Sequence, residues 1–178
     1  MKFNPGSHHR RSIRLQGYDY SLAGAYFITI CTKNRECLFG EIITNEMSLN
    51  NFGMIARDEW IKSTAIRFEI ELDEFVVMPN HFHGIVVIQG RGDRPVAPTE
   101  HRPGPQPRSI GALVAGFKSA VTKNINEIRT TPGLPVWQRN YYEHIIRDEK
   151  SYLRIAEYIV NNPLNWQQDQ YNEQNPAK

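Results

Sequence analysis

Two apolar runs on either side of Pro79-Asn80 constrain the fold of this chain more than any other feature. The first run is FEIELDEFVVM and the second is HFHGIVVIQ. Both are rich in the β-branched and aromatic residues typical of strands. Proline and asparagine favour turns, and a proline cannot donate a hydrogen bond within a central ladder. The sequence therefore predicts two neighbouring strands joined by a tight turn.

The rest of the chain alternates between strand-like and helical segments. A strand is predicted at residues 25–33, with a turn and a short second strand in NRECLFGEI, and another strand in VWQRNYYEHIIR. The predicted helices run from Asn50 or Asn51 to about Thr64, from Ser109 to the breaker TTPGLP, and from Asp148 to Pro163. Strands interleaved with helices predict an α+β fold, with an antiparallel or mixed sheet and helices packed on it.

Length and composition indicate one globular domain over residues 1–178. The chain is 40% hydrophobic and 22% charged, which is ordinary for a folded protein of this size. We expect three segments outside the packed part: a basic N-terminal arm (1–14), a proline-rich loop (90–108) and a polar, frayed tail (167–178). With two cysteines, no visible signal peptide and no membrane-length apolar run, we expect a cytoplasmic protein with no membrane partner.

Basic residues are clustered, although the net charge is only +2. The N-terminal arm carries Arg10, Arg11 and Arg14, and a second basic set includes Lys118 on the helix predicted after Ser109. Such clusters bind phosphate groups or are simply solvated surface. Charge alone leaves both interpretations open.

His81 and His83 lie one residue apart at the start of the second apolar run. Alternate residues of a strand share a face, so both imidazoles are expected on one side, roughly 7 Å apart at the backbone. Neutral imidazole is a common metal ligand, and the pair could bind one divalent ion. For that role we expect His83 to be accessible to solvent, with Phe82 in the core. A short motif of this kind is equally compatible with two partly exposed histidines near a strand end.

Tyr158 and Asn162 are four residues apart on the last predicted helix and therefore share a face. If this helix crosses the sheet near the histidines, the amide oxygen of Asn162 could complete a metal site one turn from the Tyr158 hydroxyl. A neutral phenol, with a pKa of about 10, is a poor nucleophile, but a metal that polarises a phosphodiester makes attack feasible. Spacing alone leaves open that both residues only pack and cap the helix. Tyr142 is a rival nucleophile.

Three stretches of the chain resemble one protein family. PNHFHGIVVI is similar to the histidine–hydrophobe–histidine (HUH) motif of the single-tyrosine HUH transposases. VWQRNYYEHIIRDEKSYLRIAEYIVNNPLNW resembles the C-terminal signature of the REP-associated tyrosine transposase branch, and RRSIRLQGYDYSLAGAYFITICTKNRECLFG resembles its N-terminus. The matches occur in the family's order and cover most of the chain except the proline-rich insert and the tail.

The resemblance implies a ferredoxin-like α+β domain with the HUH motif on a central strand. It implies a divalent ion, Mg²⁺ or Mn²⁺, held by His81, His83 and Asn162. It also implies that Tyr158 is the nucleophile, forming a 5′-phosphotyrosine and freeing a 3′-hydroxyl. The substrate would be single-stranded DNA beside imperfect palindromes that fold into hairpins. Related enzymes differ in whether the tyrosine helix serves its own subunit or a partner's, so a homodimer stays open.

Arg10, Arg11, Arg14 and Lys118 are then the candidates for binding the DNA backbone. The main alternative is a protein derived from such a transposase that binds DNA hairpins without cleaving them. The complete set of four site residues favours the enzyme, because a chain that no longer cleaves would be free to lose one of them. An RNA-binding sheet domain is disfavoured because YFITICTK lacks the glycine–aromatic spacing of that module.

Overall fold

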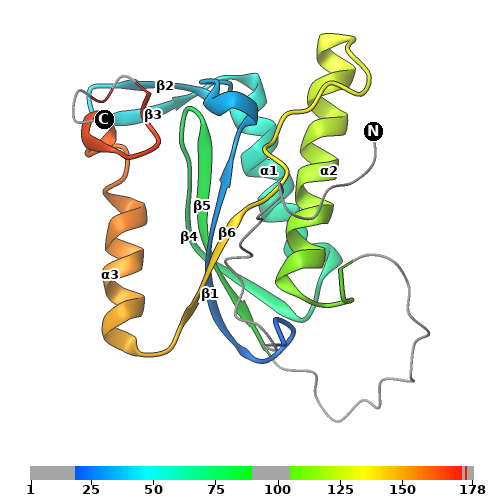
Figure 1. Cartoon of the computed structure of the whole chain (residues 1–178), viewed down its shortest axis with the longest axis vertical. Helices are drawn as coiled ribbons and strands as arrows, with labels where there is room; N and C mark the ends of the chain where they lie inside the picture. The colour runs from blue at the N-terminus through cyan, green and yellow to red at the C-terminus, as the bar shows by residue number, and fades with distance from the viewer. Residues whose placement is uncertain (1–18, 90–104, 174, 176–178) are drawn as a thin grey trace, which may run out of the picture.

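A four-stranded antiparallel sheet with strand order β4-β5-β1-β6 forms the centre of the protein (Figure 1). The computed structural model describes residues 19–89, 105–173 and 175. The strands of the sheet are β1 (Gly24–Cys31), β4 (Ile70–Val77), β5 (His81–Ile88) and β6 (Tyr142–Ile146). The predicted α+β class and antiparallel sheet are confirmed, and the His-x-His motif opens β5, a central strand.

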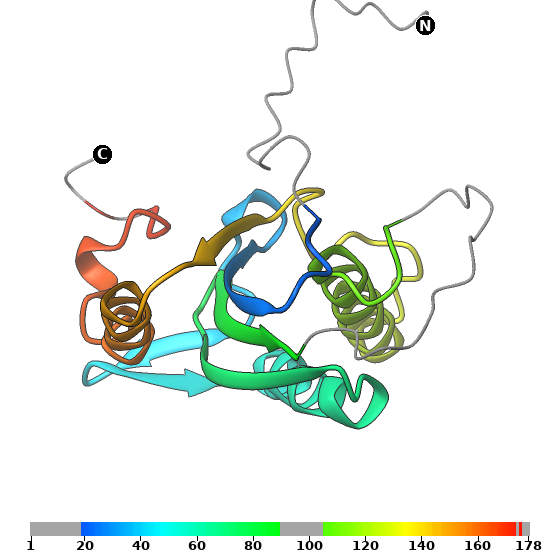
Figure 2. The ribbon, with the colours of Figure 1, turned by 90° about the horizontal axis from the view of Figure 1, so that it is seen from below.

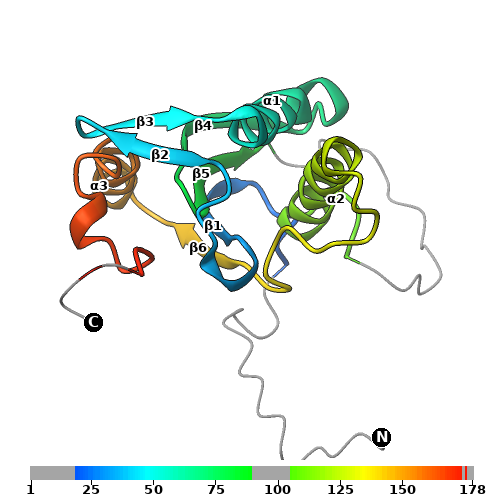
Figure 3. The same cartoon turned by 90° about the horizontal axis from the view of Figure 1, so that it is seen from above.

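Helices cover both faces of this sheet. The helices α1 (Asn51–Ile66) and α2 (Ile110–Arg129) pack against each other on one face, and α3 (Glu149–Val160) lies on the other. The views along the sheet show it between these two helical layers (Figures 2 and 3). Because α3 is alone on its face, the residues at its C-terminal end can lie close to the start of β5.

All three helices begin at the residues that the sequence indicates. The side chains of Asn50, Ser109 and Asp148 each accept a backbone N–H of the first helical turn. Such caps satisfy donors that have no partner inside the helix and typically stabilise it by about 1 kcal/mol. The cap at Asp148 therefore fixes where α3 starts and, through the helical repeat, which way Tyr158 points.

The main core lies between the sheet and the helices α1 and α2. Phe82 is fully buried there, with its ring centroid 4.6 Å from that of Trp60 and 5.3 Å from that of Phe117. The prediction that Phe82 belongs to the core is confirmed. A smaller cluster on the other face holds α3 against the sheet through Phe27 and Ile159. Because Phe82 faces the main core, its two histidine neighbours must face α3.

The structure also contains short elements that the sequence predicted only in part. A separate hairpin joins β2 (Gly40–Ile43) to β3 (Glu46–Leu49), and the sequence had indicated only the first of these strands. Two short 3-10 helices, η1 (Lys33–Arg35) and η2 (Trp166–Gln168), complete the described elements. The predicted arm at residues 1–14 and residues 90–104 of the proline-rich loop lie outside the described residues.

Candidate metal centre and tyrosine

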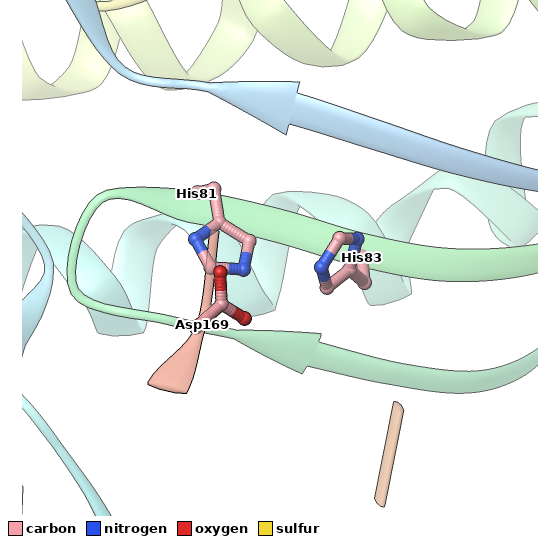
Figure 4. A group of neighbouring side chains, drawn as sticks. All are labelled: His81, His83 and Asp169. Atoms are coloured by element: carbon pink, nitrogen blue, oxygen red, sulfur yellow. The ribbon is translucent and has the colours of Figure 1, made fainter. Parts of the chain in front are cut away.

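His81 and His83 point to the same face of β5, as strand alternation predicts (Figure 4). Their ring centroids lie 4.5 Å apart. Both side chains are buried, with exposures of 0% and 1%. The expectation that solvent reaches His83 is therefore wrong.

Aromatic rings from two segments close over the histidines and explain this burial. The ring of Tyr171 lies 4.6 Å from that of His81 and 5.7 Å from that of His83. Trp166 lies 6.0 Å from His81, and Tyr158 lies 5.2 Å from His83. A phosphodiester that approaches His83 must therefore displace part of this cover.

Asn80, in the turn before β5, fixes the protonation of His81. Its side-chain oxygen lies 2.9 Å from Nδ1 of His81, while its amide nitrogen donates to the carbonyl oxygens of Arg35 and Tyr171. An amide oxygen can only accept, so Nδ1 of His81 carries the proton. In the neutral ring this leaves Nε2 as a bare acceptor, which is the form that binds a metal.

Thr29 on β1 holds His83 in a similar way. Its hydroxyl oxygen lies 2.8 Å from Nδ1 of His83, because the antiparallel register places these two residues opposite each other. When Nδ1 donates to Thr29, Nε2 of His83 carries no proton and can accept a hydrogen bond or bind an ion. The turn before β5 and the neighbouring strand β1 thus supply hydrogen bonds of the kind that orient histidine ligands in metal sites.

Burial keeps both rings neutral. It lowers the pKa of His81 to about 3. Burial, and then the neighbouring His81, lower the pKa of His83 well below its ordinary value of 6.5. Both imidazoles are therefore neutral at neutral pH, with one bare nitrogen each, and need lose no proton to bind an ion.

Two buried acceptor atoms lack a donor at this point. Within the described part of the chain, neither Nε2 of His81 nor Oδ1 of Asn162 has a hydrogen-bond partner. Asn162 is only 1% exposed, and its side chain lies against that of His81. Leaving a buried polar atom unpaired costs roughly 1–3 kcal/mol. A cation between these atoms would remove that cost.

Asp169 brings a carboxylate to the same place. Ligand atoms of His81, His83 and Asp169 all lie within 4.8 Å of one another (Figure 4). The carboxylate accepts the amide N–H of Asn162 at 3.0 Å and the backbone N–H of Tyr171 at 2.6 Å. The donor set of two imidazoles, one amide and one carboxylate suits a divalent ion.

The prediction of a frayed tail is wrong for the segment that carries Asp169. Residues 167–173 are folded, and Asp169 and Asn172 are both only 7% exposed. Side chains that bond within the segment, together with the Tyr171 ring packed on His81, hold it in place. The sequence had no apolar period there, and its only signal was an aspartate between two aromatic residues.

Tyr158 reaches the site from α3. Its hydroxyl oxygen lies 3.2 Å from Nε2 of His83, and 40% of the residue is exposed. Burial of the hydroxyl, followed by the negative charge of Asp169, raises the pKa of Tyr158 above its ordinary value. The structure thus brings together all four residues predicted for the site. With its pKa raised by burial and by Asp169, the phenol stays protonated at neutral pH.

Comparison with known sequences gives relatives over nearly the whole chain. No protein-family model matches it. An uncharacterized protein of Haemophilus influenzae is 49% identical over 175 residues, which span 95% of this chain and 96% of that protein. A second H. influenzae protein, named as a REP-associated tyrosine transposase, is 24% identical over 146 residues, or 82% of this chain and 73% of that protein.

Comparison with solved structures agrees. A REP-associated tyrosine transposase bound to a REP hairpin matches with a TM-score of 0.59 and 23% identity, over 86% of this chain and 74% of that one. This likeness shows a shared fold, and the named relative points to the same family. The chain is similar to the REP-associated tyrosine transposases in sequence and shares the fold of this solved one. Its His-x-His motif and tyrosine helix lie within that shared fold.

The residues that we predicted to bind DNA lie apart from this centre or beyond the described chain. Arg10, Arg11 and Arg14 lie outside the described residues. Lys118 is on α2, and its ammonium donates to the carbonyl oxygens of Gln138 and Arg139. Burial lowers the pKa of Lys118 to about 8. Backbone oxygens thus engage its ammonium in this structure.

Two further observations concern aromatic residues and membranes. Trp137 is 6% exposed and packs in the main core, and the hydroxyl of the partly buried Tyr141 donates to Glu143. In the described ranges, none of the helices combines the length and apolar character needed to cross a membrane.

Proposed function

We propose that this chain is a metal-dependent transposase that cleaves and rejoins single-stranded DNA beside hairpins. Tyr158 is the proposed nucleophile, and His81, His83 and Asn162 are proposed ligands of Mg²⁺ or Mn²⁺. One observation carries the proposal: two buried acceptors, Nε2 of His81 and Oδ1 of Asn162, find no donor among the described residues, beside the tyrosine that contacts His83. A fold that only binds DNA has no use for such an arrangement.

The side chains present fit a divalent ion. Carboxylate and amide oxygens suit manganese and magnesium, and imidazole nitrogens bind divalent transition metals. Asp169 adds a carboxylate to the ligands that the sequence predicts, and this negative charge would offset part of the ion's charge. A bound divalent ion would polarise a phosphoryl oxygen and lower the pKa of the nearby phenol.

The proposed reaction exchanges one phosphoester for another. The oxygen of Tyr158 attacks phosphorus, the bond from phosphorus to the 3′-oxygen breaks, and the phenolic proton is released. One DNA end leaves with a 3′-hydroxyl, and the other stays on Tyr158 as a 5′-phosphotyrosine. Because the phosphoester bond is kept, a second 3′-hydroxyl can reverse the step and join a new strand.

Hairpin DNA is the proposed substrate. A solved REP-associated tyrosine transposase that shares this fold has a REP hairpin bound. Single-stranded DNA also suits this nucleophile, because Tyr158 lies on the side of α3 and is only 40% exposed. A flexible single strand can reach such a side chain more easily than a stiff duplex can.

The test uses a labelled hairpin oligonucleotide with single-stranded flanks. The full chain is incubated with Mn²⁺, Mg²⁺, Zn²⁺ or EDTA, and adducts that survive denaturing electrophoresis are counted. We expect an adduct with Mn²⁺ or Mg²⁺, none with EDTA, and none from Tyr158→Phe under any condition. Hairpin binding without an adduct in any metal would instead support a protein that binds hairpins and does not cleave. An adduct that forms equally in EDTA would contradict the metal dependence.

A further inference from the structure

A strip of exposed residues on β6 lies beside the proposed site. Tyr142 and His144 are exposed, whereas Glu143 between them is buried and points to the other face. In the sheet register Tyr142 lies opposite Thr29, and Thr29 lies opposite His83. Residues paired in this way share a face. The side chains of Tyr142 and His83 therefore belong to one row on the face that carries α3.

The helix α3 leaves this strip uncovered, because it packs chiefly over β4, at the edge of the sheet opposite β6. The ring of Phe27, only 9% exposed, lies between Tyr142 on the strip and Tyr158 on α3. Its centroid lies 6.3 Å from that of Tyr142 and 6.2 Å from that of Tyr158, with edge contacts in both cases. Two partly exposed tyrosine rings, at 38% and 40%, thus flank one buried ring.

The charge along the strip suits a phosphate backbone. Arg154 is exposed and precedes Tyr158 by one helical turn, so both lie on the same side of α3. His144 is exposed on the facing strand. The acid of β6, Glu143, is buried on the opposite face, where it accepts the hydroxyl of Tyr141. Basic and aromatic groups are the combination that binds single-stranded nucleic acid without reading its sequence.

We infer that the unpaired nucleotides next to the scissile phosphate lie along this strip, with one base stacked on Tyr142 and a backbone phosphate near Arg154. The inference rests on the proposed function, because it places the scissile phosphate between His83 and Tyr158. The segment Trp166–Asn172 closes the site from the side of His81. The exposed row beside Tyr158 is therefore the open approach within the described residues.

The test compares Tyr142→Val with Tyr142→Phe. Valine keeps the strand propensity and removes the ring, and phenylalanine keeps the ring. Dissociation constants are measured in EDTA for a blunt hairpin and for the same hairpin with single-stranded flanks. For the flanked hairpin we expect valine to weaken binding by about five-fold or more, the effect of losing one stacked base. Phenylalanine should bind normally, and the blunt hairpin should bind all three proteins equally.

A fluorescent base analogue locates the stacked nucleotide. 2-Aminopurine at successive flank positions should be quenched at one of them by the wild type and by Tyr142→Phe, but not by Tyr142→Val. Arg154→Gln should lower the salt slope for the flanked hairpin by roughly 0.7, as expected for one lost single-strand contact. Phe68→Ala removes another exposed ring, at 74% exposure and outside this strip, and should change nothing.

Two results would overturn the inference. One is a valine variant that binds both hairpins as the wild type does, or weakens both equally. The other is a change in oligomeric state by light scattering with flank binding intact, which would make the strip a contact between copies of the chain. Binding is measured without metal, so it does not depend on cleavage. A protein that binds the single-stranded flank but never forms an adduct would contradict the proposed function and not this inference.

Discussion

The hydroxyl of Tyr158 lies 3.2 Å from Nε2 of His83, so the proposed nucleophile and a proposed metal ligand are in direct contact. This contact joins α3 to β5. Tyr142, the rival nucleophile, lies on β6, and its ring contacts Phe27. Tyr158→Phe removes only the hydroxyl, so we expect the DNA adduct to vanish while the hairpin dissociation constant changes by less than about threefold, because phosphate contacts elsewhere carry affinity.

Peptide mass spectrometry of a trapped adduct checks this prediction. The DNA remnant should be on Tyr158, and Tyr142→Phe should form the adduct as the wild type does. A remnant on Tyr142, or an adduct that survives Tyr158→Phe, would contradict the assignment and with it the proposed site.

Thr29→Val tests the hydrogen bond that orients His83. Valine has nearly the shape of threonine, but it removes the hydroxyl that lies 2.8 Å from Nδ1 of the buried imidazole. Outer-shell partners of this kind typically change metal affinity by about 10- to 100-fold. We expect Mn²⁺ affinity, measured by electron paramagnetic resonance without DNA, to fall by about that factor. Thr29→Ser keeps the hydroxyl and should restore most of it, whereas equal affinity for valine and serine would show that His83 is not a ligand.

Asp169→Asn tests the carboxylate that the sequence did not predict as a ligand. The change keeps the size and an acceptor for the N–H of Asn162, but it removes the negative charge beside the histidines. We expect Mn²⁺ affinity, measured by calorimetry without DNA, to fall by roughly tenfold or more. Glu173→Gln is the matched control, because Glu173 is an exposed acid in the same segment. If both variants lose the same affinity, Asp169 acts only through long-range charge.

The predicted N-terminal arm can be tested through salt dependence. Neutralising Arg10, Arg11 and Arg14 to glutamine should weaken hairpin binding and lower the slope of log affinity against log salt by up to roughly 2.7, for three lost duplex contacts. The measurement is a series of dissociation constants between 50 and 200 mM salt. As a control, glutamine at Arg57 and Lys62, exposed on α1, should leave the slope unchanged. An unaltered slope in the arm variant would mean that the arm is a solvated segment.

Local sequence signals predicted the parts of the site that depend on periodicity. Strand alternation put His81 and His83 on one face, and the helical repeat put Tyr158 and Asn162 on one side of α3. Apolar runs and capping residues also located the elements, because burial and capping act over a few neighbouring residues. These signals sufficed to predict which side chains share a face.

Other parts of the site depend on contacts between distant segments. Thr29 faces His83 only through the register of β1 against β5, and nothing within either strand fixes that register. Asp169 and Tyr171 belong to a segment without apolar period, held by its own polar side chains and by a ring that packs on His81. The same packing explains why the expected solvent access of His83 was wrong. Accessibility is a property of the whole fold, whereas the face of a residue is a property of its strand.

The buried histidines predict a loss of stability in mild acid. In the folded protein burial lowers the pKa of His81 to about 3 and that of His83 well below 6.5, whereas in the unfolded chain both titrate near 6.5. As the pH falls below about 6.5, His81 and His83 therefore bind protons in the unfolded state but not in the folded state. We expect the free energy of unfolding, measured with urea in EDTA, to drop by about 2 kcal/mol between pH 7 and pH 5.5. The double variant His81→Gln, His83→Gln should reduce this drop. A flat profile in the wild type would show that these rings are protonated in the fold, which would rule them out as ready metal ligands.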